Sequence, residues 1–208
     1  MEAGAGTRGA RCDSASVGVV PPAVPPAVPE SSLAELVRGH GDFYRGFAGE
    51  ISPLAPEAFF APQGDRWSPA EHADHLVRSV RPLVLGLKLP KIALWLRFGR
   101  GRGSRPNAEV IECHLALLAA GGRARGRYVP AVDREAPSAA RQERSLANLA
   151  ALGDELAAAL GRWRDRQLDR YRLPHPLLGA LTVREMVAWS LYHGRHHRAL
   201  VRERLGEG

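Results

Sequence analysis

A chain of 208 residues with 45% hydrophobic and 25% charged residues has the composition of a soluble globular protein, and it is long enough for one domain with a sizeable core. Its net charge of +7 comes almost wholly from arginines scattered along the sequence. Because no block of five or more like charges occurs, this charge does not predict a nucleic-acid-binding face. The two cysteines, Cys12 and Cys113, argue against a disulfide framework, and no secretory signal is recognised, so we expect a cytoplasmic protein.

The N-terminal segment differs in composition from the rest of the chain. Residues 1–30 contain a Gly/Ala-rich stretch followed by the proline-rich run VVPPAVPPAVPE, which is typical of a disordered tail or a stiff extended leader. The folded domain is therefore expected to span residues 31–208. It opens with Ser32 and Glu35, a capping box that is followed by apolar residues at helical spacing as far as Ile51.

Three further long helices are predicted from start signals and apolar periodicity. Ser68, Pro69 and Glu71 combine a capping serine, a proline at the first helical position and a glutamate at the third, and this second helix is expected to run to about Leu85. An apolar stripe over residues 138–171 predicts the third helix. The fourth begins with a capping box at residues 182–185, and Gly206 is expected to end it.

The long connection after the second helix is expected to contain shorter helices, at residues 87–98 and 107–120. The most apolar stretch, residues 83–98, is too short and too often interrupted by charges to span a bilayer. It could lie on a membrane surface, although packing against the domain is favoured. The role of the basic segment Arg97–Arg105 stays open, and no strand or hairpin is predicted. The expected fold is an all-α four-helix bundle with short extra helices in this connection.

Histidines are concentrated in the last helix, within the run YHGRHH. His193 and His197 are four residues apart, so both imidazoles can reach one point beside the helix, whereas His196 points elsewhere. Two histidines seldom hold a metal ion alone, and a third donor must come from another helix. The second helix offers His72 and His75, and the apolar periodicity by itself favours His72.

The segments RWSPAEHADHL, HPLLGALTVREM and YHGRHHRALV together resemble those of the DinB-like superfamily of four-helix bundles, which includes proteins regarded as metal-dependent hydrolases and thiol-dependent transferases. In that family a histidine eight residues after a Trp on the second helix accompanies a late His-x-x-x-His pair. The matching residues here are Trp67, His75, His193 and His197. The resemblance implies that the three histidines bind a divalent ion, zinc or nickel, with at least one coordination position open.

Several other polar residues can be interpreted either as functional or as structural. His196 and Glu71 are candidates for a position behind the ligands or facing a substrate, although Glu71 also completes a capping box. We expect His175 to anchor a turn by a hydrogen bond, and the remaining histidines, His40, His72 and His114, to be satisfied by a backbone carbonyl or at the surface. No general base or other catalytic residue is identified.

Two functional hypotheses follow from these patterns. The first is a metal-dependent hydrolase or low-molecular-weight-thiol transferase with a small-molecule substrate. The alternative is a non-enzymatic bundle that binds a partner or forms a homodimer, with the histidines serving stability. Nucleic-acid binding ranks last, because no aromatic stacking platform or recognition helix is evident.

Overall fold

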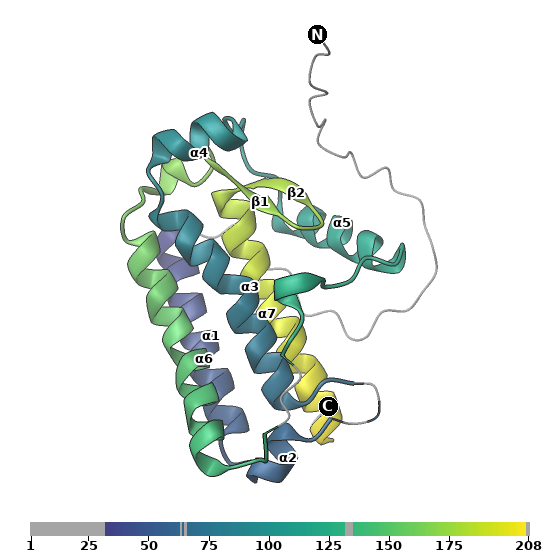
Figure 1. Ribbon diagram of the computed structural model, residues 1–208. Helices are drawn as coiled ribbons and strands as arrows, with labels where there is room; N and C mark the ends of the chain where they lie inside the picture. Colours follow the sequence, from purple (N-terminus) through teal and green to yellow (C-terminus); the bar gives the residue numbers. More distant parts are fainter. Residues whose placement is uncertain (1–31, 63, 65, 132–134, 207–208) are drawn as a thin grey trace.

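Four long helices form the body of the protein in a computed structural model that describes residues 32–62, 64, 66–131 and 135–206 (Figure 1). They are α1 (Leu33–Ile51), α3 (Pro69–Lys88), α6 (Ala139–Leu160) and α7 (Val183–Leu205). Shorter helices are α2 (Pro56–Phe60), α4 (Lys91–Phe98) and α5 (Asn107–Ala119), with 3-10 turns η1 (Gly126–Tyr128) and η2 (Asp165–Gln167) and strands β1 (Arg172–His175) and β2 (Gly179–Thr182). The predicted four-helix bundle is confirmed, while the expected tail at residues 1–30 lies outside the described residues.

The predicted helix starts are confirmed in atomic detail. Ser32, Ser68 and Thr182 each accept a hydrogen bond from the backbone N–H three residues later, and the glutamate at that position returns a bond to the capping residue's N–H. These reciprocal bonds satisfy two of the donors that a helix N-terminus leaves unpaired. At the other end of α7, Gly206 adopts φ = 76°, the left-handed conformation in which glycine commonly ends a helix.

Two predicted boundaries are wrong, each for a local reason. Helix α6 ends at Leu160 rather than near Tyr171, because Gly161 forms its C-cap. Trp163, an apolar residue of the predicted stripe, lies in the turn after the helix and donates its indole N–H to Leu87 O at 3.0 Å. Helix α4 begins at Lys91 rather than at Leu87, since Pro90 separates it from α3.

A hairpin, which the sequence did not predict, precedes α7. Strands β1 and β2 pair antiparallel, with Leu173 opposite Leu181 and His175 opposite Gly179. Each strand is only four residues long, and Pro174 and the proline after His175 hide the signal, since proline is usually absent from paired strands. Burial of Leu173 and Leu181 in the core compensates for this weak local propensity. The hairpin fixes the start of α7, because Thr182 ends β2 and caps the helix.

The basic segment Arg97–Arg105 is partly structural. The Arg105 backbone N–H and its guanidinium both donate to the Glu185 carboxylate at 2.9 Å, so the end of the segment is tied to the first turn of α7. Ser104 Oγ donates to Asp169 at 2.6 Å. These bonds hold the long connection against the bundle end that carries the hairpin.

Helices α1 and α6 approach closely at one pair of glycines. A Cβ added at Gly153 of α6 would lie 2.9 Å from Gly41 Cα and 3.1 Å from His40 O in α1. Both neighbours are backbone atoms, which cannot move without shifting the helix. The bundle core around this contact is formed by large, fully buried side chains: Leu36, Tyr44, Phe47, Ile51, Leu76, Leu149, Leu152, Leu156 and Leu160.

The Gly153→Ala variant is expected to be destabilised by about 1–3 kcal/mol, the usual cost of overpacking, even though alanine favours helix. Gly46→Ala in α1 is the matched control, because a Cβ there meets nothing within 4 Å. That variant should be stabilised, by up to about 1 kcal/mol. Urea unfolding followed by circular dichroism measures both, and equal effects in the two variants would contradict the close approach.

Candidate metal centre

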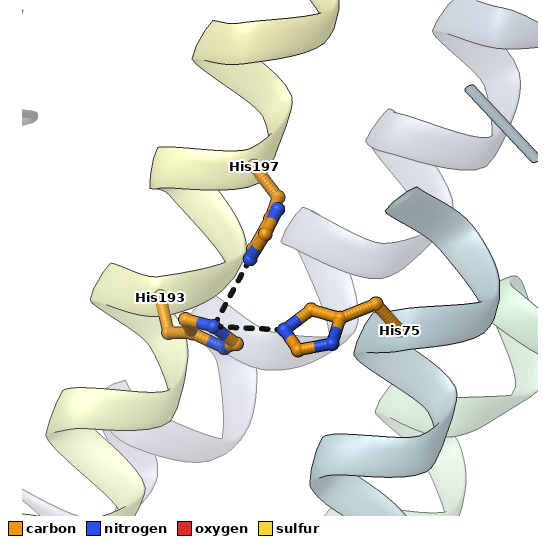
Figure 2. Close-up of side chains that lie close together, drawn as sticks. All are labelled: His75, His193 and His197. Carbon is orange, nitrogen blue, oxygen red and sulfur yellow. Dashed lines mark hydrogen bonds between the residues drawn. The ribbon is translucent and has the colours of Figure 1, made fainter. Parts of the chain in front are cut away.

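Three histidines from two helices converge on one buried point between α3 and α7 (Figure 2). His193 and His197, one helical turn apart on α7, face His75 on α3. Each offers one ring nitrogen, and these three atoms all lie within 4.8 Å of one another. The His193 Nε2 atom is 3.2 Å from His75 Nε2 and 3.0 Å from His197 Nε2. The structure thus brings together the three residues named from the sequence.

The tautomer of His75 is fixed by the connection between α5 and α6. Its Nδ1 lies 2.7 Å from Tyr128 O, and a carbonyl oxygen can only accept, so Nδ1 carries the proton and donates it. The Nε2 atom therefore faces the other two histidines with a bare lone pair. A carbonyl that fixes the outer nitrogen in this way is the usual support of a metal-binding imidazole.

His197 is supported by another histidine. Its Nδ1 lies 2.8 Å from Nδ1 of His72, which precedes His75 by one turn of α3. When His197 turns an unprotonated Nε2 toward the cluster, its Nδ1–H donates to His72, which then carries its own proton on Nε2. Trp67 flanks this pair, with its ring stacked at 11° on His197 and its centroid 5.6 Å from that of His72.

His193 is held by packing. Its ring stacks on Trp189 at a centroid distance of 4.7 Å and an interplanar angle of 15°. Its Nδ1 is buried without a hydrogen-bond partner among the described residues. Gly194 allows α7 to approach α1 beside this position, since a Cβ there would lie 2.6 Å from the Phe43 ring.

The cluster is electrically neutral at physiological pH. Burial disfavours the charged imidazolium, and this places the pKa values of His193 and His197 well below the usual 6.5. The pKa of His72 falls to about 3, mainly through burial and then through the neighbouring His75. Burial also lowers the pKa of His75, with the bond to Tyr128 opposing the shift. Neutral imidazoles keep their lone pairs available, which is the form that binds metals.

This donor set fits a divalent cation. With Zn–N bonds of about 2.0–2.1 Å, two ligands of a tetrahedral ion lie roughly 3.3 Å apart. Two of the three separations, 3.0 and 3.2 Å, are close to that value, and the third is within 4.8 Å. Three protein ligands also leave a coordination position open, as catalytic zinc sites do.

The three histidines line a cavity of about 640 Å³ that extends along α3 and beneath the hairpin. Its wall is mostly apolar and includes Leu83, Leu173 and Met186. No aspartate or glutamate is among the described residues that line it. The charged residues among the described ones that line it are three arginines, Arg123, Arg125 and Arg127, which are exposed around η1.

The other candidates named from the sequence take different positions. His196 is half-buried, lines the cavity and contacts the His197 ring edge-on at 5.4 Å. Glu71 does not line the cavity; its carboxylate accepts from the Ser68 N–H at 2.7 Å and completes the capping box. His175 anchors its turn as predicted, because its Nδ1 accepts from the backbone N–H groups of Leu177 and Leu178.

Two predictions for lone histidines need correction. His72 was expected to bond a carbonyl or the surface, but it is buried against His197. His114 was assigned the same role, yet it lies in the cavity wall with its Nδ1 unpaired among described residues and its ring 5.0 Å from Trp189. The apolar periodicity that favoured His72 correctly placed it inward. No comparable signal marks His114, because α5 has no clear apolar stripe in sequence.

Comparison with known proteins agrees with this architecture. The sequence profile of the DinB superfamily matches residues 44–201, which include α3, α7 and all three clustered histidines. The chain belongs to the DinB superfamily. Its fold is similar to that of YfiT from Bacillus subtilis, described as "a probable metal-dependent hydrolase with an unusual four-helix bundle topology". The TM-score is 0.53 at 17% identity, and the match covers 85% of this chain and 89% of YfiT. No curated protein sequence matches the chain.

Membership in the DinB superfamily explains the order of the motifs but does not specify the reaction, which has to be inferred from the site. The middle of the chain, with α4, α5 and η1, supplies the cavity wall that the recognised motifs do not contain. It is also the part that the sequence described least well.

Proposed function

We propose that this DinB superfamily protein is a metal-dependent enzyme, either a hydrolase or a transferase that uses a low-molecular-weight thiol, with His75, His193 and His197 as ligands of zinc or nickel. The observation that carries the proposal is the convergence of three neutral imidazole nitrogens in the wall of a large cavity. A structural metal site is normally closed by four protein ligands, whereas a site in a cavity wall can receive a substrate. This feature favours an enzyme over a non-enzymatic bundle.

When bound, the ion supplies Lewis-acid chemistry, acidifying a water or a thiol in the open position. The chain's own residues orient and enclose the reactants. Trp67 and Trp189 hold His197 and His193 in place by stacking, and the apolar wall excludes bulk water. His175 accepts two backbone N–H groups at Nδ1, so its proton is on Nε2 and can be donated to a substrate oxygen. His196 faces the same cavity and is a second substrate-facing group.

The cavity composition indicates the class of substrate. An apolar wall whose described charged residues are arginines suits a small molecule with an apolar body and an anionic group. A thiol that ionises to a thiolate is one such anion, and a carboxylate is another. A cationic substrate would find no carboxylate to pair with among the described residues of the wall.

Decanoate is therefore expected to bind more tightly than decanol, and far more tightly than decyltrimethylammonium. Replacing Arg123, Arg125 and Arg127 together by glutamine should weaken decanoate binding roughly tenfold, since exposed ion pairs contribute up to about 1 kcal/mol each. Isothermal titration calorimetry with chelator-treated protein separates this effect from metal ligation. The control changes three exposed arginines elsewhere, Arg38, Arg144 and Arg166, and should leave binding unchanged.

His72 is proposed to position His197. The His72→Leu variant is expected to bind metal about 10- to 100-fold more weakly, the usual effect of losing a hydrogen bond to the outer nitrogen of a ligand. His72→Gln should recover part of the affinity, because its carboxamide oxygen can accept from His197 Nδ1. Competition titrations with a chelator measure all three proteins, and equal affinity in the leucine and glutamine variants would contradict a positioning role.

The proposed function is tested by metal content and turnover. Protein purified without a metal-binding tag should retain one divalent ion per chain in elemental analysis. Esters and thiol–electrophile pairs are then assayed with the loaded and the chelator-treated protein, and turnover should require the ion. Protein that retains no ion after exposure to zinc and to nickel would overturn the proposal.

A further inference from the structure

An apolar surface lies at the end of the bundle where α3 is followed by α4, at the top of Figure 1. Five large apolar side chains are exposed there within twelve residues, with Leu85 64% and Leu96 74% exposed. The whole described chain has only one other large apolar side chain that is exposed, Val129. We call this surface the apolar patch; it comprises Leu85, Leu89, Ile92, Trp95 and Leu96. Monomeric proteins rarely gather exposed apolar side chains in this way without a binding role.

The segment that carries the apolar patch has one sign of charge. No aspartate or glutamate occurs in the sequence between Asp74 and Glu109. Exposed cations lie before, within and after the patch in sequence: Arg81, Lys88, Arg97, Arg100 and Arg102. Among the described residues none of these five forms an ion pair with a carboxylate. Their charge is therefore available to an anionic partner.

We propose that the apolar patch and these cations bind the surface of an anionic lipid bilayer. Leucine and isoleucine side chains enter the boundary between head groups and acyl chains, tryptophan lies at that boundary, and arginine and lysine contact anionic head groups. The patch has all three components. No helix in the described part of the chain has the length and hydrophobicity to cross a membrane, so the contact is with the surface alone.

Charge and side-chain chemistry distinguish the bilayer from other occupants. A second copy joined by two-fold symmetry would place the same cations against one another, and the segment that carries the patch has no acidic residue to pair them. Nucleic acid would pair with the cations but would leave the exposed aliphatic side chains unused, since base stacking needs aromatic or guanidinium planes. A bilayer uses both components at once.

The proposed docking also has a consequence for the cavity. Leu85 and Leu89 belong both to the apolar patch and to the cavity wall, so the cavity reaches the surface at the patch. His75 lies ten residues before Leu85 on α3, which is about 15 Å along the helix. A molecule with an apolar body could thus pass from the bilayer toward the histidines. The docking itself does not depend on a metal ion or on turnover.

Vesicle co-sedimentation of the full chain tests the proposal. The protein is expected to sediment with phosphatidylcholine vesicles that contain roughly one-third phosphatidylglycerol, and to remain mostly in solution with phosphatidylcholine alone. Binding should weaken with salt, and by about fivefold for each of Arg97, Arg100 and Arg102 that is changed to glutamine. The Ile92→Ser/Leu96→Ser variant should lose binding, whereas Val129→Ser, at an exposed apolar residue outside the patch, should bind normally.

A second measurement does not rely on the serine variant. Lipids brominated in their acyl chains should quench tryptophan fluorescence in the wild type and much less in Trp95→Phe, because the other tryptophans are more buried. Wild-type protein that stays in solution with anionic vesicles would overturn the proposal. Undiminished binding of the Ile92→Ser/Leu96→Ser variant to vesicles or to duplex DNA would also overturn it. So would a dimer, detected by light scattering, that this variant abolishes while the wild type does not bind vesicles.

Discussion

The His193→Ala variant is expected to lose stoichiometric metal binding, with an affinity at least about 100-fold below that of the wild type. His193 Nε2 is the atom that lies within 3.2 Å of both other donors, so its removal leaves His75 and His197 without their common neighbour. Two imidazoles on different helices then remain, which seldom hold an ion. Elemental analysis after dialysis against a weak chelator measures the loss.

Three variants are expected to differ in metal affinity in a fixed order. His193→Ala should have the largest effect, His72→Leu an intermediate one, and His196→Ala little, because His196 contacts the His197 ring edge but contributes no nitrogen to the cluster. Circular dichroism confirms that each variant is folded. If His196→Ala lost the ion while His193→Ala kept it, the assignment of ligands would be wrong.

Acidification from pH 6.5 to pH 4 is expected to remove a large part of the free energy of unfolding. His40 is fully buried between Leu36 O and Ser190 Oγ, and burial lowers its pKa from 6.5 to about 4. In this pH window the unfolded chain binds the proton and the folded chain does not, so stability is fully present above pH 6.5 and decreases as the pH falls. His40 alone accounts for about 3 kcal/mol. His114, with a pKa lowered to about 4 mainly by burial, acts in the same direction.

Urea unfolding between pH 4 and pH 7, in the presence of a chelator, measures this dependence. The His40→Gln variant should show a shallower slope, because one of the titrating groups is gone. The acidic groups act at lower pH: hydrogen bonds to Arg184 lower the pKa of Asp169 below 3.8, so its contribution is lost only beneath the window. An unfolding free energy independent of pH between 4 and 6.5 would contradict the buried, neutral state of these histidines.

The long helices were predictable from sequence because their start signals are local. A capping residue and a glutamate three positions later satisfy backbone donors within one turn. The sequence of Ser68 and Glu71 is therefore enough to predict the hydrogen bonds that begin α3. The spacing of His193 and His197 is equally local. The choice of His75 over His72 came from the family resemblance, since helical periodicity pointed to the other residue.

What could not be predicted depends on contacts between distant segments. The hairpin is stabilised by burial of Leu173 and Leu181 rather than by strand propensity. The contact of His72 with His197, 125 residues later, depends on how α3 packs against α7, although periodicity had placed His72 inward. Tyr128 supports His75 through its backbone oxygen, and since every residue type has such an oxygen, the sequence cannot indicate this role. The exposure of the apolar patch likewise follows from where α4 packs, with Leu94 turned inward and Ile92 and Leu96 outward.

The bond from His75 to Tyr128 O joins the histidine cluster to the segment that carries the cavity arginines. Since η1 supplies both that oxygen and Arg127, and Arg125 directly precedes it, an ion that orients His75 also restrains the loop. Cooperativity between two ligands is reciprocal by thermodynamic necessity. If a bound ion tightens anion binding at the arginines by some factor, the anion tightens retention of the ion by the same factor, so protein without the anion would release the ion more readily than protein that holds it.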